Sequence, residues 1–126
     1  MRLLIWGCEG VGREIINILK GIEHPYQEIG YILDTPTSQT EILGFPIQGD
    51  RQLLDQVCPS HTHVFPAATS PATRRLFANY IQKKGFYIPS FIHPTATVRP
   101  EACLGTGLLA YAHAYIDNLT KIGDCV

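Results

Sequence analysis

The feature that most constrains the fold is a six-residue repeat that runs from Ile92 to the end of the chain. Each unit opens with an aliphatic residue and usually has a small fifth residue; the opening residues are Ile92, Val98, Leu104, Ala110, Ile116 and Ile122. A period of six fits neither the 3.6-residue period of an α-helix nor the two-residue period of a strand. It fits a triangular β-solenoid in which each unit forms one face and three units form one coil. We therefore predict the first coils of a parallel β-helix over residues 91–126, with the aliphatic residues pointing inward.

Residues 1–90 instead alternate strand and helix patterns. Leu3–Trp6 is a continuous apolar run, which is typical of a parallel strand buried on both faces. A glycine-rich turn follows over 7–12, and a helical pattern begins at Gly12 with Ile15, Ile16, Ile18 and Leu19 on one face. Further strands are predicted at 29–33, 63–67 and 86–88, and helices at 51–56 and 71–84, the last with Leu76, Phe77, Tyr80 and Ile81 at core spacing. This order predicts an α/β fold, a small Rossmann-like domain with a parallel sheet, right-handed crossovers and helices on both faces.

Composition excludes several classes of partner. The 126 residues carry a net charge of -1 with acids and bases intermixed, so the basic stripe needed for nucleic-acid binding is missing. No apolar run approaches the length that spans a bilayer, and we expect no membrane partner. The four cysteines form no C-x-x-C pair, which favours a reduced, cytoplasmic chain. The apolar start is interpreted as a buried strand and not as a signal peptide, because it is too short.

The glycine-rich turn is a candidate phosphate site. It joins a buried strand to a helix, where backbone N–H groups and the positive end of the helix dipole can face an anion. Its pattern, Gly-x-x-Gly-x-Gly, differs from the dinucleotide Gly-x-Gly-x-x-Gly. The alternative is a tight turn whose glycines only let helix and strand pack closely. The candidate ligand-binding residues of this segment are Gly7, Cys8, Glu9, Gly10, Val11, Gly12 and Arg13.

Three members of that segment have open interpretations. Glu9 would repel a pyrophosphate unless its side chain points away. Arg13 could contact a phosphate or pair with an acid near its helix. Cys8 precedes a helix N-terminus that would lower a thiol pKa, so it is either a reactive thiol or a small residue that fills a tight loop.

A second candidate position is Asp34, at the carboxyl end of the second predicted strand. An acid there is placed to accept hydrogen bonds from a ribose or a base edge, and the alternative is a solvated loop acid. His61 and His63 would share one face of a strand, but no third ligand is evident, so no metal site is predicted. We expect His93 to be structural and His113 to lie at the surface.

Four segments together resemble a known family. Residues 7–14 look like the family's glycine loop, which usually reads Gly-x-Gly-Gly-His-x-Arg-Glu, and residues 31–34 look like the family's second strand with a terminal acid. Residues 44–49 look like the family's Gly-x-Pro-x-x-Gly connector, and residues 91–96 look like the start of the family's β-helix. The chain thereby resembles the sialic-acid O-acetyltransferases and the pilin-glycan, or UDP-4-amino-sugar, N-acetyltransferases. The resemblance implies that residues 1–90 bind a UDP-sugar or similar nucleotide sugar. It further implies a left-handed β-helix of hexapeptide repeats over 91–126, acetyl-CoA as co-substrate and a homo-oligomer, a trimer in the family.

The chain departs from that family in two respects. In the glycine loop, Glu9 replaces the second glycine and Val11 replaces the usual histidine. Residues 67–70 stand where the family has Ala-Ile-Gly-Asp/Asn, and this position makes Ala68 a candidate substrate contact. The family's base is a histidine beyond the segment that residues 122–126 resemble, and His113 lies one coil too early. We therefore expect no catalytic residue and an incomplete acetyl-CoA site in this chain. A truncated acetyltransferase, a non-catalytic nucleotide-sugar-binding module and an NAD-binding Rossmann domain remain as hypotheses.

Overall fold

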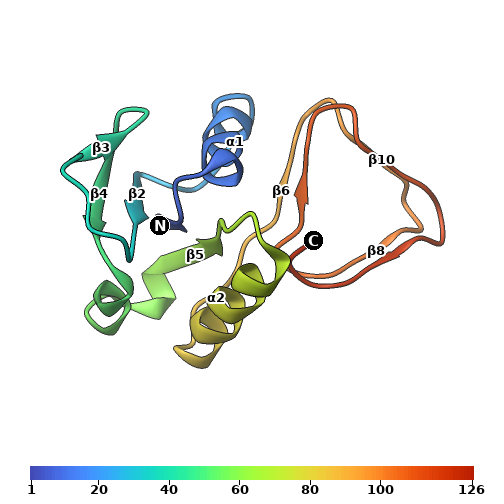
Figure 1. The fold of residues 1–126 in the computed structure, drawn as a ribbon. Helices are drawn as coiled ribbons and strands as arrows, with labels where there is room; N and C mark the ends of the chain where they lie inside the picture. The colour runs from blue at the N-terminus through green and yellow to red at the C-terminus, as the bar shows by residue number, and fades with distance from the viewer.

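A computed structural model describes all 126 residues, and its first part is built around one mixed sheet (Figure 1). The sheet has the strand order β3-β4-β2-β1-β5. Its strands are β1 (Arg2–Trp6), β2 (Glu28–Ile32), β3 (Glu41–Ile42), β4 (Phe45–Gly49) and β5 (Thr62–Pro66). β1 pairs in parallel with both β2 and β5, and β2 pairs in parallel with β4. The predicted α/β fold with a parallel sheet is therefore confirmed, and only the short edge strand β3 runs antiparallel to its neighbour.

Two α-helices pack on this sheet, α1 (Gly10–Lys20) and α2 (Pro71–Lys83). In the view of Figure 1, α1 lies above the central strands and α2 lies below them. α1 buries the predicted aliphatic face, Ile15, Ile16, Ile18 and Leu19, although it begins two residues earlier than expected. α2 begins as predicted, with Ser70 as N-cap and proline in the first turn.

The prediction that Leu76 belongs to the core is wrong, because its side chain is 69% exposed. The buried face of α2 centres on Ala78 and Ile81. At 3.6 residues per turn, Leu76 lies about 200° around the helix from Ala78. The sequence spacing therefore found the helix but assigned one residue to the wrong face.

Three other predicted elements differ in the structure. Residues 44–49, expected to be a tight connector, contain β4, which forms a hairpin with β3. The expected helix over 51–56 is a 3-10 helix, η1 (Arg51–Asp55), which Asp50 caps as predicted by accepting a hydrogen bond from the Gln52 amide. Such short segments commonly stay in the tighter 3-10 form. A second 3-10 turn, η2 (Pro59–His61), precedes β5. The expected strand at 86–88 is reduced to a single parallel bridge between Tyr87 and His63.

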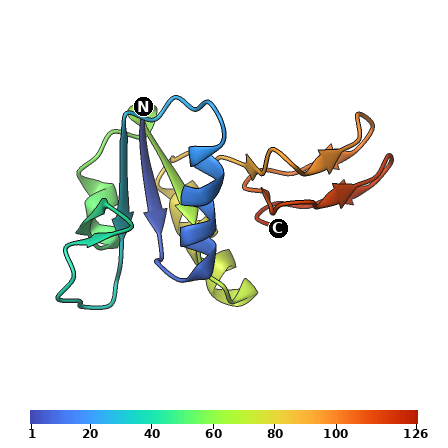
Figure 2. The ribbon, with the colours of Figure 1, turned by 90° about the horizontal axis from the view of Figure 1, so that it is seen from above.

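The repeat segment, residues 91–126, contains six two-residue strands. They are β6 (Phe91–Ile92), β7 (Thr97–Val98), β8 (Cys103–Leu104), β9 (Leu109–Ala110), β10 (Tyr115–Ile116) and β11 (Lys121–Ile122). Each of the first three pairs in parallel with the strand eighteen residues later, in the order β6 with β9, β7 with β10 and β8 with β11. The segment traces a three-sided outline in Figure 1, and Figure 2 shows it from another side as two layers.

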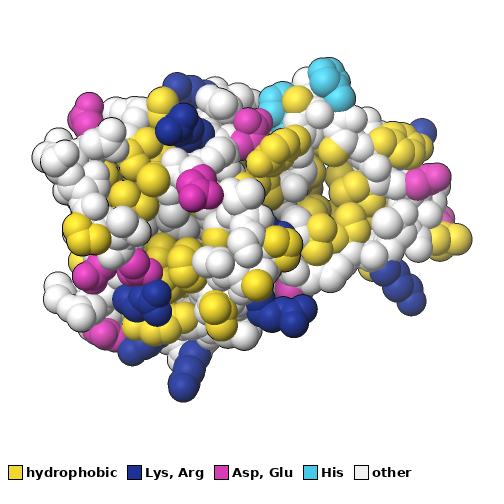
Figure 3. All heavy atoms as spheres, in the orientation of Figure 1, with side chains coloured by type: hydrophobic (Ala, Val, Ile, Leu, Met, Phe, Trp, Pro, Cys, Tyr) yellow, Lys and Arg dark blue, Asp and Glu magenta, His cyan; other side chains and the backbone are white.

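The opening residues of the repeats are unevenly buried. Ala110 and Ile116 are buried, Ile92, Val98 and Ile122 are half-buried, and Leu104 is 38% exposed. Figure 3 shows hydrophobic side chains gathered within the three-sided outline. Leu104 is therefore less buried than the other opening residues. Neither α1 nor α2 has the length and apolar character that crossing a membrane requires.

Candidate functional site

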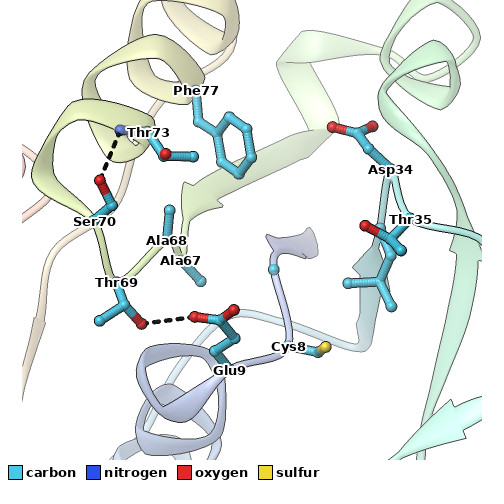
Figure 4. A pocket seen from close by; sticks show the side chains of 12 residues that line it. Cys8, Glu9, Asp34, Thr35, Ala67, Ala68, Thr69, Ser70, Thr73 and Phe77 are labelled. Atoms are coloured by element: carbon cyan, nitrogen blue, oxygen red, sulfur yellow. Dashed lines mark hydrogen bonds between the residues drawn. The ribbon is translucent and has the colours of Figure 1, made fainter.

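A cavity of about 280 Å³ lies at the carboxyl edge of the parallel strands. Its walls come from the loops that follow β1, β2 and β5 and from the first turns of α2 (Figure 4). The lining residues are Gly7, Cys8, Glu9, Leu33, Asp34, Thr35, Ala67, Ala68, Thr69, Ser70, Thr73 and Phe77. In a parallel sheet the carboxyl ends of all strands meet at one edge, so segments far apart in the sequence converge here. We call this cavity the edge pocket.

Close backbone approaches explain two glycines of the turn after β1. Gly7 has a φ of +117°, and a Cβ there would lie 2.7 Å from the Ala67 carbonyl oxygen. A Cβ on Gly12 would lie 2.5 Å from the Gly7 carbonyl oxygen. Gly10 is different, because nothing lies within 4 Å of a Cβ at that position. The packing interpretation of the glycines is thus supported for Gly7 and Gly12.

Glu9 reaches across the pocket mouth to the loop after β5. Its Oε2 accepts a hydrogen bond of 3.0 Å from the Thr69 hydroxyl, which Figure 4 shows as a dashed line. The side chain is not used to cap α1, since it makes no hydrogen bond to the first turn of that helix. The carboxylate therefore lies on the rim of the pocket, where it disfavours an anion beside the start of α1 and favours a hydrogen-bond donor.

Asp34 is held in place on the opposite side of the pocket. Its Oδ2 accepts hydrogen bonds from the Arg51 guanidinium at 2.8 Å and from the Trp6 indole at 3.2 Å. Burial works to raise the pKa of Asp34, but the hydrogen bonds from Arg51 and Trp6 outweigh it and the net pKa is lowered. Its Oδ1 accepts only the Arg51 backbone amide, at 3.2 Å. Because a carboxylate oxygen has about two lone pairs, Oδ1 keeps one for a ligand.

The third wall is the start of α2. Ser70 and Thr73 present hydroxyl groups there, and the Phe77 ring stacks on Trp6 with 4.0 Å between ring centroids. None of the lining side chains is basic, whereas two are acidic. Phosphate groups would therefore depend on hydroxyls, backbone N–H groups and the positive helix end, while carboxylates would serve the N–H and O–H donors of a ligand.

The structure gathers five of the nine predicted binding residues in this pocket, namely Gly7, Cys8, Glu9, Asp34 and Ala68. The other four lie elsewhere: Gly10 and Arg13 are exposed, Gly12 is buried under the loop, and Val11 lines a different, apolar cavity beside the repeat segment. Sequence reasoning missed Thr69, Ser70, Thr73 and Phe77 as pocket residues. The signal for them was the Ser-Pro helix start directly after a strand, which places that helix end at the same edge as the glycine turn.

The histidines make no cluster of ligands. Tyr26 and His63 form a hydrogen bond of 2.8 Å, and burial lowers the pKa of His63. His93 and His113 both contact the Thr95 hydroxyl, the first through its ring and the second through its backbone amide. No group of three or more His, Cys, Asp or Glu side chains is arranged to hold a metal ion.

Comparison with known families decides the classification. The family model of the PglD N-terminal domain matches residues 2–81. The chain belongs to the PglD N-terminal domain family. The match extends from β1 to the last turn of α2, so this family domain contains every wall of the edge pocket. Comparison with curated protein sequences gives no significant match.

Solved structures extend the likeness of this PglD-family chain beyond residue 81. The acetyltransferase domain of PglB from Neisseria gonorrhoeae, in complex with acetyl coenzyme A, is 28% identical with a TM-score of 0.88 and matches 98% of this chain. A variant of perosamine N-acetyltransferase from Caulobacter crescentus, in complex with CoA and GDP-perosamine, is 26% identical with a TM-score of 0.85 and matches 99%. This chain spans 59% and 58% of the length of those two proteins. Both matches include the repeat segment as well as the sheet.

Proposed function

We propose that this protein is a nucleotide-sugar acetyltransferase and that the edge pocket binds the nucleotide sugar. The observation that carries the proposal is the position of the pocket. β1 continues to β2 on one side of the sheet, while β5 lies on its other side, so the strand order reverses at β1. In open α/β sheets, ligands bind in the crevice outside the carboxyl ends of the strands at such a point. The likeness to structures that contain acetyl-CoA, CoA and GDP-perosamine supports this assignment.

The proposal assigns different roles to two parts of the chain. Residues 1–90 form a Rossmann-like nucleotide-sugar-binding domain, and residues 91–126 belong to a left-handed β-helix of hexapeptide repeats. The pairing of residues eighteen apart supports the second assignment, because three six-residue faces make one coil. Acetyl-CoA is the proposed donor, and a homotrimer is the proposed assembly, as in the family that the sequence resembles.

The proposed reaction is acyl transfer to an amine. The sugar amine attacks the thioester carbonyl carbon, a base takes the amine proton, and the CoA thiolate leaves. We assign no base among the described histidines. His63 bonds to Tyr26, and His93 bonds to Thr95 at a corner of the repeat segment. The role proposed for residues 1–126 is therefore to bind and orient the nucleotide sugar.

Calorimetric titration of a matched pair of variants tests the pocket assignment. Cys8 lines the edge pocket, and its side chain makes no hydrogen bond, so C8F fills the cavity without removing one. Cys58 is exposed and outside the pocket, so C58F is the control for the substitution itself, and the hydrogen bond that it removes, to Ser60 at 3.0 Å, also lies outside the pocket. We expect wild type and C58F to bind GDP-perosamine or a UDP-4-amino sugar, and C8F to lose at least about tenfold in affinity, which corresponds to 1.4 kcal/mol. Equal affinities of the two variants would refute the assignment.

The same titration separates the competing hypotheses. Binding of NAD in preference to nucleotide sugars would favour an NAD-binding domain instead. Binding of a nucleotide sugar without acetyl transfer from acetyl-CoA in a turnover assay is the result expected both for the binding role proposed for residues 1–126 and for a non-catalytic module, and the carboxylate of Glu9 on the pocket rim favours the module. Nucleotide-sugar binding together with acetyl transfer would support the acetyltransferase proposal.

A further inference from the structure

Arg74 connects three backbone carbonyls from two distant parts of the chain. It lies in the first turns of α2 and is half-buried. Its Nη1 donates to the Ala68 carbonyl at 3.0 Å and to the Thr69 carbonyl at 3.3 Å, and its Nε donates to the Cys125 carbonyl at 2.9 Å. Figure 1 shows the C-terminal end beside the start of α2, in agreement with this contact. One guanidinium thus spans the gap between the loop after β5 and the last turn of the repeat segment.

One other hydrogen bond joins residues 1–90 to the repeat segment, and it lies at the junction itself, where the Leu108 amide donates to the Ser90 hydroxyl at 3.0 Å. The remaining contacts between the two parts are apolar. The Phe65 and Phe91 rings lie 5.4 Å apart, and Gly21 packs against Pro94. Apolar packing is non-directional, whereas a guanidinium with several hydrogen bonds has a fixed geometry. The relative orientation of the two parts therefore depends on Arg74 more than on any other side chain.

The loop that Arg74 holds is a wall of the edge pocket. Ala68 and Thr69 both line the pocket, and the Thr69 hydroxyl also donates to Glu9 at its rim. A ligand that fills the pocket contacts this loop, and one that bonds to the Thr69 hydroxyl or to Glu9 displaces the bond between them. Either event acts on the carbonyls that Arg74 binds, and the same guanidinium binds Cys125.

We propose that Arg74 is a positioning residue that couples occupancy of the edge pocket to the repeat segment. A nucleotide sugar held by the loop is thereby presented to the repeat segment in one orientation, and its binding steadies the strands around Cys125. This inference rests on the proposed function, because it requires a ligand in the edge pocket. It adds a residue that touches neither the pocket cavity nor the reacting atoms.

Hydrogen exchange read by mass spectrometry tests the coupling in the full chain. The Cys125 amide donates to the Thr106 carbonyl at 2.7 Å, so peptides from 106–126 report on this region. The variants are R74Q, which removes the charge and shortens the side chain, and R74K, which keeps the charge but has a single donor nitrogen. R75Q is the control, since Arg75 is exposed and makes no hydrogen bond or ion pair. The probe is GDP-perosamine or a UDP-4-amino sugar, whichever binds more tightly to wild type.

We expect the probe to slow exchange of these peptides by at least about fivefold in wild type and R75Q, the lower end of usual coupling between sites. In R74Q and R74K we expect the probe still to bind but the slowing to fall below about twofold. A purely structural role would change the exchange of the free protein and leave the effect of the probe intact. Slowing that persists in both Arg74 variants, or binding to wild type without slowing, would overturn the inference. Failure of wild type to bind any probe would instead overturn the proposed function.

Discussion

Replacing Gly12 with alanine should destabilise the protein, while the same change at Gly10 should not. A Cβ at position 12 would meet the Gly7 carbonyl oxygen at 2.5 Å, and Gly7 is held in place because its amide donates to the Ile32 carbonyl at 3.1 Å. Overpacking costs about 1–3 kcal/mol, and a rigid backbone neighbour puts this contact near the upper end, about 3 kcal/mol. The better helix propensity of alanine offsets about 1 kcal/mol. The expected net loss for G12A is therefore about 2 kcal/mol.

Gly10 provides the matched control, because it lies in the same helix and a Cβ there meets nothing within 4 Å. We expect G10A not to destabilise the protein and, through the same helix propensity, to stabilise it by up to about 1 kcal/mol. Urea denaturation followed by the fluorescence of Trp6, the only tryptophan, measures both variants at the strand that leads into this turn. With a urea slope of about 2 kcal/mol per M, the midpoint of G12A should fall by about 1 M. Midpoints for G12A and G10A that agree within error would refute the close-approach argument.

Three further changes have expected outcomes. The buried Tyr31 hydroxyl has no hydrogen-bond partner, so Y31F should stabilise the fold by about 1 kcal/mol, as measured by urea denaturation. The control Y26F loses the hydrogen bond to His63 and should destabilise the fold. Because the pKa of Asp34 is lowered in the folded state, its stabilising effect is present above the ordinary carboxyl pKa of about 4 and is lost as pH falls through the lowered value. D34N should therefore flatten the dependence of stability on pH between 7 and 3, and an unchanged dependence would contradict this. The exposed Leu119 has a φ of +62°, so L119N should raise the melting temperature by relieving about 0.5–1 kcal/mol of strain, while L76N on the exposed helical face should not.

The sequence predicted the elements whose signals are periodic or local. The aliphatic face of α1, the Ser-Pro start of α2 and the six-residue spacing of β6 to β11 all depend on residues within one element or on a fixed repeat. The hairpin of β3 and β4 was missed because its strands are short and rich in turn-forming residues. β4 is a strand because β2 supplies parallel hydrogen-bond partners for it, which no local pattern records.

The edge pocket was predictable only in part for a related reason. The glycine turn and Asp34 follow strands, and strand ends in a parallel sheet share an edge. The partners of these residues come from distant segments, since Thr69 lies 60 residues after Glu9 and Arg51 lies 17 residues after Asp34. The position of Asp34 after a strand could be predicted from the sequence. Its hydrogen bonds from Arg51 and Trp6, which use most of its acceptor capacity, could not.

The eighteen-residue pairing of the repeat segment restricts how its length can vary. Phe91 lies beside Leu109, and Cys103 lies beside Lys121, so each residue has a fixed partner one turn later. Loss of a single residue between two paired strands would turn the inward-facing side chains of the later strands outward. Loss of six would keep the interior pattern but move each later strand to another side of the triangle. Homologues should therefore gain or lose sequence here in multiples of a complete turn, or as loops bulging from a corner, whereas the loop before β3 can change length freely.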